Sequence, residues 1–202
     1  MNILIASIFS IDSYSRGIMP DVLQSQLNKF PDANIYYLTC SNTFDVCYFN
    51  IHRKPDVCYR CKTGVKNTLK LVSGNFKHIV VSDIISAENK KQAALFFSDK
   101  SIIGFDHIFE NFEVGAATLS TYISRSRDRD LLDADQDYVK ELAINALSIY
   151  LGLQEFLQKE KIELVYNFNG RQDYVRAVLR ASLSKNIDCY NVERARLGGN
   201  IE

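Results

Sequence analysis

The chain has 202 residues, of which 47% are hydrophobic and 24% are charged. This size and composition suit one globular domain or one half of a two-domain protein. Its 24 lysines and arginines balance 24 aspartates and glutamates, which excludes a global charge that would attract nucleic acid or an anionic membrane. We therefore expect no nucleic acid partner. No apolar run reaches the roughly 18 residues of a transmembrane segment.

The first residues, MNILIASIFS, do not read as a signal peptide, because they lack a positively charged start and a clear cleavage site. They indicate a buried strand instead. We expect a cytoplasmic protein, in which its five cysteines stay reduced.

Short apolar runs alternate with helical patterns along the chain. The expected strands are 2–8, 34–40, 78–84, 162–168 and 187–192. The expected helices are 19–30 with Pro20 near its first turn, 62–72, 88–98, 108–127, 139–157 and 172–184. Residues 41–61 are expected to be irregular. This alternation predicts an α/β fold over 1–202, a single Rossmann-like domain with a mainly parallel sheet and helices on both faces.

The stretch ELVYNFNGRQDYVRAVLRASL, residues 163–183, is a candidate binding site. An apolar strand stops at Asn169, Gly170 and Arg171, and a helix begins at once. Gly170 permits a tight turn, the helix N-terminus attracts anions, and Arg171 offers a fork suited to carboxylate or phosphate. Open α/β sheets bind ligands at this end of their strands. The alternative is an ordinary connecting loop with a solvated arginine.

Two other segments are expected to reach the same place. Glu193 and Arg194 follow the last strand, and the loop 9–17 follows the first strand. Because the carboxyl ends of parallel strands share one edge of the sheet, three loops should ring one cleft. The first loop contributes Asp12, Arg16 and Gly17. The alternative for Glu193 and Arg194 is a surface ion pair, which contributes little stability.

Four cysteines fall in one short window, TCSNTFDVCYFNIHRKPDVCYRC. Cys58 and Cys61 have the C-x2-C spacing of a zinc knuckle, and with Cys40 and Cys47 they would close a tetrahedral structural zinc site. His52 lies between the pairs and is a possible replacement ligand. A redox pair and four plain reduced thiols are the alternatives.

Several common motifs are absent. No G-x-G-x-x-G follows the first strand and no Walker A motif occurs, so a classical dinucleotide or P-loop ATP site is not expected. The chain also has no G-x-S-x-G and no H-E-x-x-H motif.

The segment ELVYNFNGRQDYVRAVLRASLSKNIDCYNVERA resembles part of the N-terminal half of bacterial surface-polysaccharide glycosyltransferases with a GT-B-like plan. In those proteins a strand ends in Phe-Asn-Gly-Arg, a helix follows, and the next strand ends in Glu-Arg. The block LTC…DVCYFN…CYRC is also similar to a cysteine-bearing segment of that family. The resemblance follows the order of elements along the whole chain.

The resemblance implies that the chain is the acceptor-side domain of a capsular polysaccharide glycosyltransferase. A missing C-terminal domain would bind the nucleotide-sugar donor, and this domain would bind the saccharide acceptor and be inactive alone. Glu193 or Asp12 would be the base that deprotonates the acceptor hydroxyl. The cations Arg16, Arg171 and Arg194 would stabilise negative charge.

Two other functions fit the residues. One is a Rossmann-like binding or regulatory domain for a small anionic ligand, which would not be an enzyme. The other is a zinc-stabilised interaction module.

Overall fold

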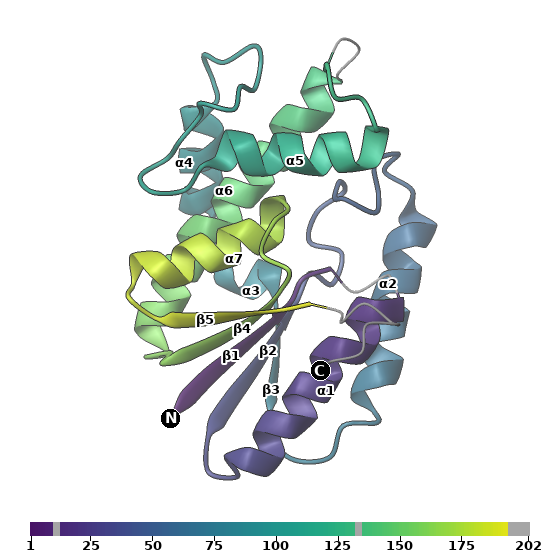
Figure 1. The fold of residues 1–202 in the computed structure, drawn as a ribbon, viewed down its shortest axis with the longest axis vertical. Helices are drawn as coiled ribbons and strands as arrows, with labels where there is room; N and C mark the ends of the chain where they lie inside the picture. The colour runs from purple at the N-terminus through teal and green to yellow at the C-terminus, as the bar shows by residue number, and fades with distance from the viewer. Residues whose placement is uncertain (10–12, 132–134, 194–202) are drawn as a thin grey trace, which may run out of the picture.

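The computed structural model describes residues 1–9, 13–131 and 135–193. Its centre is a five-stranded sheet with the strand order β3-β2-β1-β4-β5, in which all neighbouring strands are parallel (Figure 1). The strands are β1 (Asn2–Ser7), β2 (Asn34–Thr39), β3 (Lys77–Val80), β4 (Leu164–Phe168) and β5 (Asp188–Val192). The predicted Rossmann-like α/β fold is therefore confirmed.

The central strand β1 is buried on both faces. Its residues from Ile3 to Ala6 have no exposed surface, and Ile3 lies between Ile35 of β2 and Leu164 of β4. A strand covered on both sides needs no polar face, which explains the continuous apolar run in the sequence.

One face of the sheet is covered by α1 (Ser13–Lys29) and α2 (Pro55–Leu69), which lie side by side (Figure 1). Ile3 and Ile5 pack there with Met19 of α1. The helix α1 begins earlier than predicted, so the second half of the expected loop 9–17 is helical. Pro20 therefore lies inside the helix and not in its first turn.

The opposite face carries the larger core. Its helices are α3 (Val81–Ile84), α4 (Ala87–Phe96), α5 (Val114–Ser126), α6 (Gln136–Lys159) and α7 (Asp173–Ser184). The apolar stripe predicted over 139–157 forms the buried side of α6, which packs against α4, α5 and α7. Among the described residues, no helix is both long and apolar enough to cross a membrane.

Other predicted elements also differ from the structure, and the helix expected over 108–127 begins only at Val114. The third strand ends at Val80, because the next four residues turn into the short helix α3. The helix expected over 62–72 begins at Pro55, which occupies its first turn, where a missing N–H costs nothing. Cys58 and Cys61 therefore lie on a helix and not in an irregular segment.

An ion pair joins the start of α5 to α7. Glu113 accepts hydrogen bonds from Arg176 Nε and Arg180 Nε, each at 2.6 Å. Burial alone would raise the pKa of Glu113, but the hydrogen bonds from both guanidinium groups outweigh it and lower the pKa to about 2. The two arginines thus hold two helices together.

We predict that Glu113→Gln lowers the free energy of unfolding at pH 7 by about 1–3 kcal/mol, because the charge-assisted hydrogen bonds from Arg176 and Arg180 weaken. Since the folded pKa is below the ordinary value of 4.5, the contribution is present at neutral pH and is lost as the pH falls from about 4.5 to about 2. Urea unfolding of the wild type and the variant at several pH values measures this difference in the free energy of unfolding. Glu88→Gln on the exposed side of α4 is the control, and equal effects of the two substitutions at pH 7 would contradict the prediction.

Candidate functional site

A cavity lies at the carboxyl ends of the strands, where the order of the sheet changes direction. From β1 the sheet grows through β2 and β3 on one side and through β4 and β5 on the other. Ligands of open α/β sheets bind at such a switch point. We call this space the switch-point cavity; it is lined by Ile8, Phe9, Cys40, Asn42, Phe44, Cys47, Phe49, Val57, Cys58, Cys61 and Tyr174. Its walls come from the segments that follow β1, β2 and β4.

Tyr174 forms a fixed aromatic wall of this cavity. Its ring stacks on Phe9 with 5.6 Å between the centroids and lies 5.2 Å from the ring of Phe44. The Tyr174 hydroxyl donates to the carbonyl of Val46 at 2.7 Å and accepts from Asn145 Nδ2 at 3.2 Å. The side chain is fully buried. The cavity therefore has a rigid aromatic wall with a satisfied hydroxyl group.

A buried carboxyl group lies next to this wall. Asp173 has no exposed surface, and its Oδ2 has no hydrogen-bond partner in the described chain. Burial raises the pKa of Asp173 to about 7, although the N–H of Tyr174 and the hydroxyl of Thr121 oppose this shift. The sequence showed only an acid in the first turn of a helix, which is usually a solvent-exposed residue that favours the helix dipole. Its burial was not foreseen.

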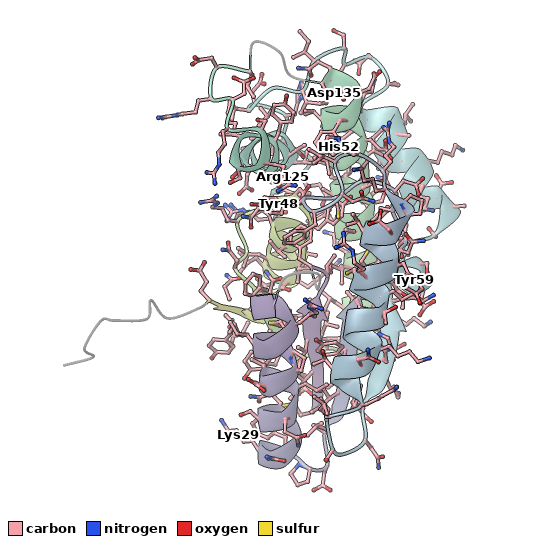
Figure 2. All side chains as sticks on the ribbon, turned by 90° about the vertical axis from the view of Figure 1, so that its right-hand side faces the viewer. Lys29, Tyr48, His52, Tyr59, Arg125 and Asp135 are labelled. Carbon is pink, nitrogen blue, oxygen red and sulfur yellow. The ribbon has the colours of Figure 1, made fainter. Side chains whose placement is uncertain are left out.

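A polar groove adjoins the cavity on the outside, and we call it the basic groove. It has a volume of about 480 Å³ and is lined by Phe49, Asn50, Ile51, His52, Lys54, Asp56, Val57, Arg60 and Arg125. Phe49 and Val57 also line the switch-point cavity, so the two spaces share a wall. Figure 2 shows this side of the molecule, with His52 and Arg125 in its upper part and Tyr59 on α2. Sequence reasoning singled out His52 only as a substitute zinc ligand.

Asn50 fixes the segment between the groove and the cavity. Its side-chain carbonyl accepts from the N–H of Lys54 at 2.7 Å, and its amide group lies within hydrogen-bond distance of the carbonyls of Asp45 and Lys54. The same amide donates to Cys58 Sγ at 3.3 Å. Asn50 is buried. Its hydrogen bonds connect the loop before α2 to the first turns of that helix.

The turn after β4 is explained by its connecting role. Asn169 and Gly170 both have positive φ, 65° and 74°, and the N–H of Arg171 donates to Asn169 Oδ1 at 3.1 Å. Arg171 Nη2 donates to Ser124 Oγ of α5 at 2.7 Å. None of the three predicted residues lines the switch-point cavity, and their binding role stays a prediction.

Arg16 and Gly17, the two predicted first-loop residues that the structure describes, are not seen to contact that turn. Arg16 lies across Gly64 of α2 and lines a separate surface groove of about 330 Å³. Gly17 is an exposed residue of α1 with open space around it. Arg171 bonds to α5, whereas Arg16 contacts α2, so the expected ring of arginines is not seen in the described residues.

Of the other predicted catalytic and binding residues, the structure describes only Glu193. Glu193 is exposed and follows β5, which is an edge strand separated from β1 by β4. Asp12 and Arg194 lie outside the described residues. The structure therefore gives no pairing of Glu193 with either of them.

The four predicted metal ligands do come together. Cys40, Cys47, Cys58 and Cys61 form no disulfide among the described residues, and all four line the switch-point cavity. The described chain nevertheless contains no group of three or more histidine, cysteine, aspartate or glutamate side chains placed to hold a metal ion, so the zinc prediction finds no support. Burial raises the pKa of Cys47 to about 12 and also raises the pKa of Cys40, which keeps both thiols protonated at neutral pH.

No family model and no curated protein matches the chain, but solved structures do. The chain is similar to a cyclodipeptide synthase (CDPS) from Fluoribacter dumoffii, with a TM-score of 0.54 and 11% identity over 93% of this chain and 87% of the synthase. It is also similar to the tyrosyl-tRNA synthetase of Leishmania major in complex with tyrosinol, with a TM-score of 0.50 and 11% identity over 97% of this chain. The chain covers only 26% of that synthetase.

The predicted acceptor domain of a polysaccharide glycosyltransferase is wrong, because the solved structures found to be similar include a cyclodipeptide synthase and a tRNA synthetase and point away from that function. Part of the resemblance rested on a strand that ends in a small polar turn with an arginine. Asn169 and Gly170 supply the positive φ angles that such a turn needs, and many parallel α/β sheets need the same connection. The motif thus did not identify a glycosyltransferase.

We predict that Asp173→Asn stabilises the protein above pH 7. The folded pKa of about 7 is higher than the ordinary 3.8, so wild-type stability falls as the pH rises through this window and the variant avoids the loss. The expected gain at pH 8 is on the order of 2–4 kcal/mol, with little difference near pH 4. Thermal melts of the wild type and the variant between about pH 4 and pH 8 measure this difference in stability. Asp188→Asn, an exposed change on β5, is the control; an equal gain for both variants would contradict the prediction.

Proposed function

We propose that the protein binds an aminoacyl group carried on RNA, with the amino acid in the switch-point cavity and the RNA phosphates in the basic groove. The observation that carries this proposal is the shared wall between an aromatic cavity and a cationic groove at the switch point of the sheet. A ligand with an apolar end and a polyanionic end matches both spaces at once.

The fold supports the same ligand class. One similar protein is named for joining tyrosine to tRNA and was solved with tyrosinol, and the other is named for making cyclodipeptides. Both names concern amino acids. An aromatic wall of the kind that Tyr174, Phe9 and Phe44 form suits an apolar or aromatic amino acid side chain through stacking and burial.

The charge around α2 supports an RNA partner, in contrast to the expectation from net charge. Residues 53–70 include six basic residues and one acidic residue, a local charge of +5 in a chain of net charge zero. Lys54, Arg60 and Arg125 line the basic groove, where Asp56 is the acid. Phosphate contacts of this kind dominate the affinity of proteins for nucleic acid.

Entry of an amino acid requires movement of the cavity's cover. The switch-point cavity has a volume of about 30 Å³, which is room for roughly two water molecules. The segment 41–54 covers it without forming a helix or strand and includes left-handed residues at Ser41, Asn42 and Arg53. When an amino acid binds, the segment 41–54 must therefore move aside, and the side chain of the ligand occupies the space that this segment now fills.

Binding of tyrosinol and of unfractionated tRNA tests the proposal. We expect tyrosinol at millimolar concentration to raise the melting temperature, because a ligand that binds only the folded state stabilises it. Labelled tRNA should bind with a steep salt dependence. Arg125→Ala should weaken tRNA binding and reduce the slope of log K against log salt by about 1, as expected for one lost phosphate contact.

Lys91→Ala on α4 is the matched control, since it also removes one exposed cation but lies outside the basic groove. Its tRNA affinity and salt slope should equal those of the wild type. Absence of both tyrosinol and tRNA binding at low salt, or equal losses in the two variants, would sink the proposal. We also propose that the protein works in the cytoplasm, a location supported by its five cysteines, which form no disulfide among the described residues. A second, C-terminal domain stays a prediction.

A further inference from the structure

A further space, larger than the switch-point cavity, lies between α2 and the edge of the sheet, and we call it the α2 groove. It has a volume of about 470 Å³. One wall is the stretch of α2 from Cys61 to Leu69 with Lys70 beyond it, and the other is formed by Thr39, Phe76 and His78 at β2 and β3. The volume falls in the range of small-molecule sites.

The helix α2 leaves this space unfilled. It has 15 residues and none of them is buried, although a helix packed on a sheet normally buries an apolar stripe. Val65 and Leu69 line the groove and are only half-buried. Phe76 on the opposite wall is also half-buried. Apolar surface that neither helix nor sheet covers is available to an apolar ring or chain.

Three cations line the same groove. Lys62, Lys66 and Lys70 follow one another at intervals of four residues, so they form a row about 12 Å long on one side of the helix. All three are exposed, and none forms an ion pair with a described residue. The one acid of α2, Asp56, is paired with Arg60. The row therefore presents uncompensated positive charge.

The floor of the groove offers a polar contact without charge. Thr39 Oγ1 and His78 Nε2 are 2.9 Å apart and hydrogen-bonded. Desolvation lowers the pKa of His78, so its ring is neutral at pH 7 and presents a flat π face. Thr39 is buried.

We propose that the α2 groove binds a nucleoside phosphate, with the base against Leu69, Phe76 and His78 and two or more phosphates along the lysine row. A flat ring with hydrogen-bonding edges fits the apolar walls and the Thr39–His78 pair, as bases do on aromatic platforms elsewhere. A fatty acid would use one cation for its carboxylate, whereas three cations in a row match a chain of phosphates.

Two sources offer this chemistry, a free nucleotide and the last nucleotides of an RNA strand. The RNA source rests on the proposed function and deepens it, because Cys40 and Cys61 line both the α2 groove and the switch-point cavity. A nucleotide in the groove therefore lies next to the space assigned to the aminoacyl group. The free-nucleotide source does not depend on that assignment.

Calorimetric titration with three probes tests the inference: ATP, inorganic tripolyphosphate, and a short single-stranded RNA with a free 3′ adenosine. We expect ATP or the RNA to bind, and to bind at least tenfold more tightly than tripolyphosphate, because the base adds apolar contact. The double variant Lys62→Ala/Lys66→Ala should weaken that binding at least tenfold. Lys90→Ala/Lys91→Ala, which removes two exposed cations from α4, should leave it unchanged.

Val65→Trp fills the groove from the helix side and should abolish binding while tripolyphosphate retains its weak affinity. A melting curve verifies that this variant folds, and the lysine variants change only exposed side chains. Binding of ATP without the RNA supports the free-nucleotide source, and binding of the RNA without ATP supports the RNA source. Binding of neither, equal affinity for tripolyphosphate, or equal losses in the two double variants would overturn the inference. ATP binding lost only in the α2 variants supports it even when tyrosinol and tRNA fail to bind.

Discussion

The burial of β1 on both faces is the constraint that organises this protein. A strand with no exposed residue between Ile3 and Ala6 must have a neighbour on each side and helices above and below. Parallel neighbours require crossover connections. The short connection through α1 places β2 on one side, and the long one through α3–α6 returns to place β4 on the other. The switch point between β1 and β4 is a consequence of these two connections.

The site at this switch point combines groups that are costly for stability. Asp173 is a buried carboxyl group with an oxygen that lacks a partner in the described residues, and such a group destabilises a core that could be apolar. Next to it, Tyr174 joins the wall of the cavity through stacking and through two hydrogen bonds. Polar groups buried beside a cavity are common where a protein binds or reacts with a ligand. The helix α2 adds incomplete packing and positive charge on the same side of the molecule.

Local charge and total charge lead to opposite expectations here. The total of zero argued against a nucleic acid partner. The chain, however, concentrates basic residues in 53–70, and the fold turns this segment into an exposed helix beside two grooves. An attraction that depends on a few phosphate contacts is set by the charges within about a Debye length, roughly 10 Å at moderate salt. The count over the whole chain is therefore a poor guide to this surface.

The sequence by itself determined the five strands, the parallel α/β plan and the apolar side of α6, because burial leaves a periodic pattern in the residues. The cysteine-rich window also predicted that four cysteines lie together, and all four line one cavity. Only the tertiary structure decided what the polar residues do. Arg171 bonds to Ser124, and Asp173 is buried beside Thr121, partners about 50 positions away in the chain. A contact between residues so distant in sequence leaves no periodic signal, so the short motif around Arg171 suggested a protein family that the comparisons do not support.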